Sequence, residues 1–432
     1  MNLRSSARAV APLLFVIACR AAPPVTVPPP APSRPAAVVR VRLTPTDVLQ
    51  RATPNVVGMD AALTPTLDSL AAQGIRETAA PGMSIAVGRY GRLVQLRGYG
   101  ATDWQPGSTP VSDSTLYDLA SLTKVIATTT AAMILEEEGR LDISRPVSSY
   151  VPELNAPDKA AITVRELLTH SGGLEAGANL YTRAHGRAEY LAQINLRPLR
   201  YAPGTQMIYS DWDMVLLQAV IERITGQPLD QFVGARVFGP LGMRDTRFNP
   251  DTLDTALRAR IAPTAIDTTR GGLLHGVVHD ANAWAIGGVS GHAGLFSSAR
   301  DLAVFAAMLL NGGEYSGVRI LHPETIARWT TRQSGMSSRA LGWDTPTPNS
   351  SSGHYFSPHS FGHTGFTGTS LWIDPERGLF VVLLMNRVNS RGVSERHVQL
   401  RRDVSDAVQS SIVDAPLIDW EATLRAPPNR TP

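Results

Sequence analysis

Residues 116–125 read Leu-Tyr-Asp-Leu-Ala-Ser-Leu-Thr-Lys-Val, and they place Ser121 three positions before Lys124, one of only two lysines in the chain. An apolar run follows as far as Gly139, so a helix is expected over about 121–139. Positions i and i+3 share one face of a helix, which brings the Ser121 hydroxyl within reach of the Lys124 amine. A neutral amine there can take the serine proton, and the start of a helix favours the negative charge that develops. The alternative reading is a chance pair, because serine is common.

The second motif is Tyr209-Ser210-Asp211, which stands just before a helix expected over 212–226. A phenol at the entry to a helix can exchange protons with a nearby serine when cations lower its pKa. The alternative is a tyrosine that only packs, with Asp211 as the N-cap of the following helix.

The third motif is His363-Thr364-Gly365, which is followed by Phe366 and by a strand expected over 369–373. Glycine lets the backbone approach a ligand closely, and an N–H group at a strand edge can complete an oxyanion hole. The alternative is a glycine-rich turn with an exposed histidine.

In this order and at roughly this spacing, the three motifs resemble those of the serine β-lactamase and penicillin-binding protein superfamily. That superfamily is marked by Ser-x-x-Lys, then Tyr-x-Asn or Ser-x-Asn, then Lys-Thr-Gly. The chain is similar to the branch that contains class C β-lactamases, D-Ala-D-Ala carboxypeptidases and many esterases, over about residues 60–411. The intervening segments that add to the resemblance are 167–174, 291–297 and 361–372.

The resemblance implies an α/β fold of the α+β type, β-lactamase/transpeptidase-like, with an antiparallel sheet flanked by helices and an all-helical subdomain beside it. The patterns agree, since a hairpin is expected over 83–100 and a second one joins 369–373 to 379–385. Strands at both ends of the domain would then form one sheet, with helices between them. Further helices are expected over 59–76, 163–169, 187–194, 228–236, 301–311 and 396–413.

Carried over by motif, the resemblance makes Ser121 the acylated nucleophile and Lys124 its proton partner. Tyr209 resembles the residue that deprotonates the serine and later activates water. The backbone N–H groups of Ser121 and Phe366 would form the oxyanion hole. The residues expected to line the substrate site are Asp211, His363, Thr364 and Gly365. No cofactor is implied.

Two of these residues depart from the family pattern. Asp211 stands where asparagine is usual, and a carboxylate near Lys124 should raise the pKa of the lysine and shift the role of base toward Tyr209. His363 replaces the lysine of Lys-Thr-Gly, and a histidine is mostly neutral at pH 7. Arg387 is a candidate for the missing cation. These changes favour an ester, then a D-Ala-D-Ala peptide, over a β-lactam as substrate.

Composition excludes several other classes. Of 432 residues, 43% are apolar and 18% are charged, and the net charge is 40 − 37 = +3. The sequence contains no run of five like charges, so it lacks the dense basic surface of a nucleic-acid-binding protein. The single cysteine excludes a disulfide framework and a cysteine-ligated zinc. Three histidines, His275, His279 and His292, lack a metal-binding spacing, so no metal site is expected.

Two further polar segments are expected to have structural and not catalytic roles. Ser171, after His170, is an alternative nucleophile, but no base stands at a fixed spacing from it, so a turn is the preferred interpretation. Residues 280–284 are expected to form a loop at the rim of the cleft.

The first residues are expected to be a signal peptide, with Arg4 and Arg8 before an apolar stretch over 9–18 that is too short to span a bilayer. Val-Ile-Ala-Cys at 16–19 resembles a bacterial lipobox, which predicts lipidation of Cys19; ordinary signal-peptidase cleavage is the alternative. Seven prolines within residues 23–35 indicate an extended tether. The predicted organisation is a signal peptide (1–18), an anchor and tether (19–57), a hydrolase domain (58–413, with a helical insertion at about 140–289) and a tail (414–432).

These observations predict an exported serine hydrolase of the bacterial cell envelope, held to the membrane by its lipid. Its substrate would be a small molecule or a fragment derived from peptidoglycan, with no nucleic-acid partner. A β-lactamase, or a non-catalytic peptidoglycan-binding or penicillin-binding protein on the same fold, is the alternative function. The oligomeric state is left open.

Overall fold

A computed structural model of the chain describes residues 48–392 and 394–425. The predicted signal peptide, Cys19 and the proline-rich tether lie outside the described residues, so they stay predictions. Within the described ranges, no helix is both long and apolar enough to cross a bilayer.

A six-stranded sheet with the strand order β1-β3-β2-β13-β12-β11 organises the fold. The first predicted hairpin is β2 (Gly82–Arg89) and β3 (Arg92–Gly100), and the second is β12 (Ser370–Asp374) and β13 (Leu379–Met385). Antiparallel pairing of β2 with β13 joins the two hairpins at the centre of the sheet. The prediction of one sheet built from both ends of the domain is therefore confirmed. The edge strand β11 (Phe361–Thr364) contains His363 and Thr364, the first two residues of the third motif.

The other edge and the C-terminal segment extend the folded domain beyond the predicted 58–413. The strand β1 (Gln50–Arg51) pairs in parallel with β3, so the sheet is not wholly antiparallel and it begins before residue 58. The helix α12 (Trp420–Arg425) follows the predicted end, and Glu421 forms a buried ion pair of 2.9 Å with Arg402. Two-residue strands and a six-residue helix carry too little periodicity to be read from sequence.

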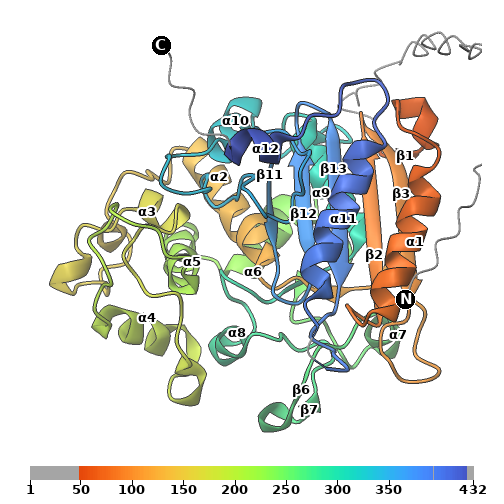
Figure 1. Ribbon diagram of the computed structural model, residues 1–432. Helices are drawn as coiled ribbons and strands as arrows, with labels where there is room; N and C mark the ends of the chain where they lie inside the picture. Colours follow the sequence, from red (N-terminus) through yellow and green to blue (C-terminus); the bar gives the residue numbers. More distant parts are fainter. Residues whose placement is uncertain (1–47, 393, 426–432) are drawn as a thin grey trace, which may run out of the picture. The chain divides into compact units, whose positions relative to one another are not determined.

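Helices cover both faces of the sheet (Figure 1). On one face lie α1 (Leu63–Arg76) and α11 (Arg396–Ser410), and on the other lies α9 (Ala299–Leu310). Side chains alternate along a strand, so Val381 and Leu383 of β13 join the core under α1 and α11. Their neighbours face α9 instead, which explains why β13 is apolar throughout.

The region predicted as an all-helical insertion also contains short strands, and this corrects the prediction. The insertion itself holds three of these strands. One, β5, pairs with β8 in a small sheet of order β4-β8-β5 whose other two strands lie outside the insertion, and β6 pairs with β7. The elements of this region and its surroundings are α3 (Val164–Leu168), α4 (Gly186–Leu196), α5 (Asp211–Thr225), α6 (Leu229–Val233), α7 (Thr255–Ala259), α8 (Ala281–Ile286), α10 (Pro323–Thr330), β4 (Tyr117–Asp118), β5 (Arg247–Phe248), β6 (Ile266–Asp267), β7 (Gly272–Leu273) and β8 (Leu295–Ser297).

The helix predicted after Ser121 forms, but its first part is wider than an α-helix. Residues Lys124–Thr129 are π-helical, and α2 (Thr130–Glu137) continues them. The chain leaves the helix through Gly139, whose φ of +69° suits glycine. π-Helical segments often occur at functional sites. The wider turn begins at Lys124, three residues after Ser121.

Candidate active site

Lys124 is the centre of the site, because three groups converge on its ammonium. Its Nζ donates to Ser121 Oγ at 2.9 Å and to the carbonyl of His292 at 3.1 Å, and it forms an ion pair of 2.8 Å with Asp211. Burial of this lysine alone would lower its pKa, but the Asp211 carboxylate and Tyr209 outweigh that effect, so the pKa of Lys124 is raised. The predicted contact between Asp211 and Lys124 is present in the structure, and the raised pKa of the lysine agrees with the prediction that the carboxylate holds it protonated.

Tyr209 lies among cations and histidines. The Lys124 ammonium is 4.9 Å from the centre of the Tyr209 ring, and the Arg339 guanidinium is 5.0 Å from it. The rings of His170 and His363 lie 4.5 and 5.8 Å away. The Tyr209 hydroxyl is buried and makes no well-formed hydrogen bond with any described residue. Negative charge that develops on Tyr209 would therefore have two cations within about 5 Å of its ring.

The third motif has a cation beside it that was not predicted. Arg339 Nη1 lies 3.2 Å from His363 Nε2, and His363 Nδ1 lies 2.8 Å from the carbonyl oxygen of Thr364. Burial and the charge of Arg339 hold the pKa of His363 well below its usual range. The neutral ring thus accepts from Arg339 and donates to Thr364. No local motif around Arg339 marks this role in the sequence.

Arg387, the predicted replacement cation, packs against Phe366, the residue that follows the third motif. Its guanidinium stacks 4.2 Å from the centre of the Phe366 ring, and its Nε donates to the Phe366 carbonyl at 2.6 Å. The His279 ring also stacks on Phe366, at 5.6 Å. These three side chains line a cavity of about 290 Å³.

The loop 365–369 packs against the segment that leads into Ser121. Thr369 donates its hydroxyl proton to the Leu119 carbonyl at 2.9 Å, and a Cβ on Gly365 would lie 2.3 Å from that same carbonyl oxygen. Only glycine fits there. Neither the Ser121 N–H nor the Phe366 N–H donates to an acceptor among the residues that the structure describes. Both predicted oxyanion-hole donors are therefore free.

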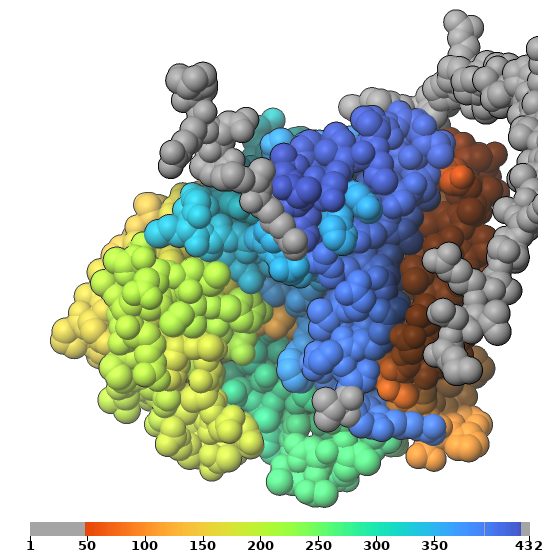
Figure 2. Space-filling model, viewed as in Figure 1, coloured from red at the N-terminus to blue at the C-terminus, as the bar shows by residue number. Residues whose placement is uncertain are grey.

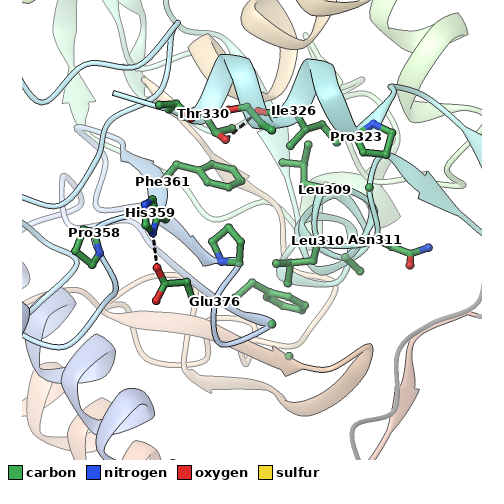
Figure 3. Close-up of a pocket in the computed structure, with 18 of the residues that line it drawn as sticks. Leu309, Leu310, Asn311, Pro323, Ile326, Thr330, Pro358, His359, Phe361 and Glu376 are labelled. Atoms are coloured by element: carbon green, nitrogen blue, oxygen red, sulfur yellow. Dashed lines mark hydrogen bonds and ion pairs between the residues drawn. The ribbon is translucent and has the colours of Figure 1, made fainter. Parts of the chain in front are cut away.

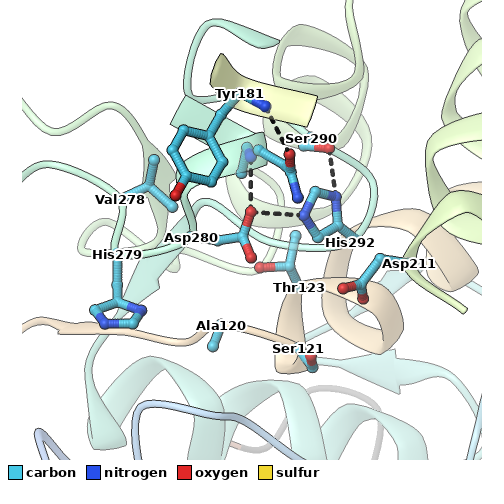
Figure 4. A network of polar contacts seen from close by, with 12 residues as sticks. Ala120, Ser121, Thr123, Tyr181, Asp211, Val278, His279, Asp280, Ser290 and His292 are labelled. Carbon is cyan, nitrogen blue, oxygen red and sulfur yellow. Dashed lines mark hydrogen bonds and ion pairs between the residues drawn. The ribbon is translucent and has the colours of Figure 1, made fainter. Parts of the chain in front are cut away.

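A polar network surrounds His292, whose carbonyl accepts from Lys124 (Figure 4). His292 bonds through Nε2 to Asp280 at 2.9 Å and through Nδ1 to Ser290 at 2.8 Å. One ligand atom each of His292, Asp280 and Asp211 lies within 4.8 Å of the others, a grouping that can hold a metal ion. Each of the three already has a partner in the protein. Asp280 also caps α8, which occupies the segment predicted as a rim loop.

The alternative nucleophile, Ser171, has no base as a hydrogen-bond partner within residues 48–392 and 394–425. Its hydroxyl lies 2.8 Å from that of Thr169. The buried His170 ring turns away to Asp213, with 3.0 Å between Nδ1 and Oδ2. The interpretation of this segment as a structural turn is consistent with these contacts.

The site lies apart from a cavity at the other end of the edge strand β11. In the space-filling view, a small orange area, the colour of the segment around residue 120, is visible between the yellow-green helical region and the blue C-terminal region (Figure 2). A cavity of about 990 Å³ instead adjoins Phe361, at the opposite end of β11 from Thr364, and Leu309 and Ile326 contribute to its walls (Figure 3). None of the predicted site residues lines it.

A serine and a buried lysine one turn apart, beside a sheet edge, define a hydrolase of the serine β-lactamase fold. The Beta-lactamase family model matches residues 67–405, and the chain belongs to that family. A protein of Escherichia coli K12 is 35% identical over 377 residues, which is 79% of this chain and 86% of the relative. A Salmonella agona protein is 34% identical over 381 residues, covering 79% and 87%. Both carry the provisional name D-alanyl-D-alanine carboxypeptidase.

Solved structures agree on the fold. A β-lactamase/D-alanine carboxypeptidase from Pseudomonas syringae has a TM-score of 0.64 at 22% identity, covering 80% of this chain and 98% of its own. EstCE1, described as a hydrolase with promiscuous acyltransferase activity, gives 0.64 at 24% identity with the same coverage. At such identities the likeness shows the fold alone. The predicted fold class and family resemblance are confirmed.

Proposed function

We propose that this protein is a cell-envelope serine hydrolase that forms an acyl-enzyme at Ser121, with D-Ala-D-Ala-type amides as its first substrate class and esters as its second. The observation that carries the proposal is the hydrogen bond from Lys124 to Ser121, with Asp211 fixing the charge of the lysine. The provisional name of the relatives supports the peptide over the ester. Export and lipidation at Cys19 remain part of this proposal.

Acylation needs a base for the serine proton, and we assign that role to Tyr209. Lys124 is already protonated and can only donate, while Tyr209 lies against it. Tyr209 takes the proton as Ser121 Oγ attacks the substrate carbonyl, and the oxyanion is stabilised by the N–H groups of Ser121 and Phe366. Collapse breaks the amide bond, and the leaving amine receives the proton from Tyr209.

Deacylation reverses the roles with water in place of the serine. Tyr209 removes a proton from water, the hydroxide attacks the acyl carbonyl, and the same two N–H groups hold the second oxyanion. Release of the acid returns the proton to Ser121 Oγ. Lys124 keeps its proton throughout and stabilises both the phenolate and the departing serine oxygen.

A D-Ala-D-Ala substrate ends in a carboxylate next to the scissile bond, so its binding requires a cation at that end. Arg339 is suited to this task, because its hydrogen bond to His363 sets it beside the third motif. Its one carboxylate partner among the described residues, Asp344, lies 3.7 Å away. A guanidinium can bind a carboxylate through two parallel hydrogen bonds, which a lysine cannot do.

Intact-mass measurement after treatment with a fluorophosphonate tests the acyl-enzyme. The wild-type protein should gain one adduct, and Ser121→Ala should gain none while it keeps its thermal unfolding midpoint. A parallel panel of nitrocefin, p-nitrophenyl acetate and a diacylated D-Ala-D-Ala peptide separates the substrate classes. Penicillin labelling without turnover of any member of the panel would instead identify a binding protein. An adduct on Ser121→Ala would refute the assignment of the nucleophile.

A further inference from the structure

Arg401 of α11 holds the loop 365–369 from behind. Its Nη2 donates to the carbonyl oxygens of Gly365 at 2.6 Å and Thr369 at 3.0 Å, and its Nε donates to that of Gly368 at 3.3 Å. A planar guanidinium can reach several acceptors at once because its N–H groups form a rigid fork. One side chain therefore engages three of the five carbonyls of this loop.

Arg387 engages the remaining two carbonyls. Its Nε donates to Phe366 O at 2.6 Å and its backbone N–H donates to Thr367 O at 2.8 Å. Every carbonyl of residues 365–369 thus accepts a hydrogen bond from one of two arginines. The loop cannot turn a peptide group over without breaking at least one of these bonds.

The peptide group between Gly365 and Phe366 joins Arg401 to the reaction site. Arg401 bonds its carbonyl oxygen, and the N–H of the same group is the free donor of Phe366. A charged donor on the oxygen of an amide pulls electron density from its nitrogen, so the N–H becomes a stronger donor. The charge of the guanidinium is in this way relayed through one peptide group.

Within the described part of the chain, the Arg401 guanidinium forms hydrogen bonds only with this loop. The side chain is buried, and its described hydrogen bonds all go to backbone carbonyls of the loop. Burial, with the nearby charge of Arg387, lowers the pKa of Arg401 to about 10, so it stays protonated at neutral pH. The next residue, Arg402, is also buried but is neutralised by Glu421 at 2.9 Å.

We propose that Arg401 is a positioning residue of the oxyanion hole: it fixes the peptide group between Gly365 and Phe366 and strengthens the Phe366 N–H toward the substrate oxyanion. This inference rests on the proposed attack by Ser121. Arg401 does not touch the substrate, so its effect belongs to the transition state and not to ground-state binding.

Phenylboronic acid tests the proposal, because boron accepts the electron pair of Ser121 Oγ and one boron-bound oxygen takes the place of the oxyanion. Three variants are compared with the wild type: Arg401→Gln, Arg401→Lys and the matched control Arg402→Gln. We expect Arg401→Gln to weaken phenylboronic acid binding and to lower kcat for p-nitrophenyl acetate by about ten- to a hundredfold each, with KM changed by less than about threefold. Arg401→Lys keeps a positive charge but lacks the forked N–H groups, so its boronic acid affinity and its kcat should lie between those of the wild type and Arg401→Gln. Arg402→Gln should leave both quantities near wild type.

Each outcome decides the question. Wild-type affinity for phenylboronic acid in both Arg401 variants would overturn the proposal, and so would an equal loss in Arg402→Gln, since that would be a general effect of removing a buried arginine. If Arg401→Gln does not fold, as measured by thermal unfolding, Arg401→Lys carries the comparison. Fluorophosphonate labelling of the wild type distinguishes failure of the proposed function from failure of the Arg401 proposal. Absence of an adduct at Ser121 would refute the proposed function, whereas an adduct together with unchanged Arg401 variants would refute only the role of Arg401.

Discussion

Asp211 Oδ1 lies 2.8 Å from the buried Nζ of Lys124, and from there the lysine donates to Ser121 Oγ at 2.9 Å. An asparagine at position 211 could not hold the lysine in its charged form, because a neutral amide offers no Coulomb attraction. The carboxylate therefore decides which group at this site can act as a base.

Asp211→Asn should move the basic limb of the pH–rate profile to lower pH. Burial favours the neutral form of Lys124, and the carboxylate and Tyr209 currently outweigh it. Removing the carboxylate lowers the pKa of Lys124, so the required ammonium is lost earlier as the pH rises. Hydrolysis of p-nitrophenyl acetate measured between about pH 6 and 10 checks the shift. A basic limb left in place would assign Asp211 only to the first turn of α5.

Tyr209→Phe should reduce kcat far more than Asp211→Asn, by about 10²- to 10⁴-fold, which is typical for loss of a general base. The ring would keep its contacts with Lys124 and Arg339, so the fold should survive. Tyr315→Phe, which removes a hydroxyl bonded only to the Leu49 N–H, is the control. The opposite ranking of the two site variants would route the proton through Lys124.

Arg339→Gln should raise KM for a D-Ala-D-Ala peptide by roughly ten- to a hundredfold, the equivalent of about 1.5–3 kcal/mol for a hydrogen bond to a charged group. It should change KM for p-nitrophenyl acetate little, because that ester has no carboxylate. Arg387→Gln tests the other candidate in the same assay. A larger effect in Arg387→Gln would transfer the role to the Phe366 side of the loop.

Gly365→Ala should lower stability by about 1–3 kcal/mol, as overpacking usually does, and should lower kcat as well. The new Cβ would lie 2.1 Å from Thr369 Oγ1 and 2.3 Å from the Leu119 carbonyl oxygen, so the loop must move away from the serine segment. Gly335→Ala is the control, since nothing lies within 4 Å of a Cβ there. Thermal unfolding and acylation rates of both variants give the comparison.

Cys19→Ser should release the protein from the membrane fraction, because the acyl chains would supply the membrane affinity. Fractionation of cells that express either form, followed by detection of the protein, measures this. If both forms fractionate alike, Cys19 is an unmodified residue.

The parts of the fold that could be predicted are those with a local signal. Alternation in residues 83–100 and the apolar run of β13 predicted the two hairpins, because the period of a strand depends only on neighbours along the chain. The contact between Lys124 and Asp211 was predicted differently, from the motifs of the family that the chain resembles. Short elements such as β1 and the π-helical turn at Lys124–Thr129 have no such period.

Sequence by itself determined the family, the nucleophile candidate and the identity of the side chains that can move protons, because these depend on which residue types occur in which order. Only the tertiary structure shows which arginines lie at the site. Arg339 reaches His363 across 24 positions, and Arg401 reaches Gly365 across 36 positions. With 38 arginines in the chain, no local pattern distinguishes these two. Both reach these positions because packing of α11 and the sheet edge brings distant segments within hydrogen-bond distance, where a buried charge must find its acceptors.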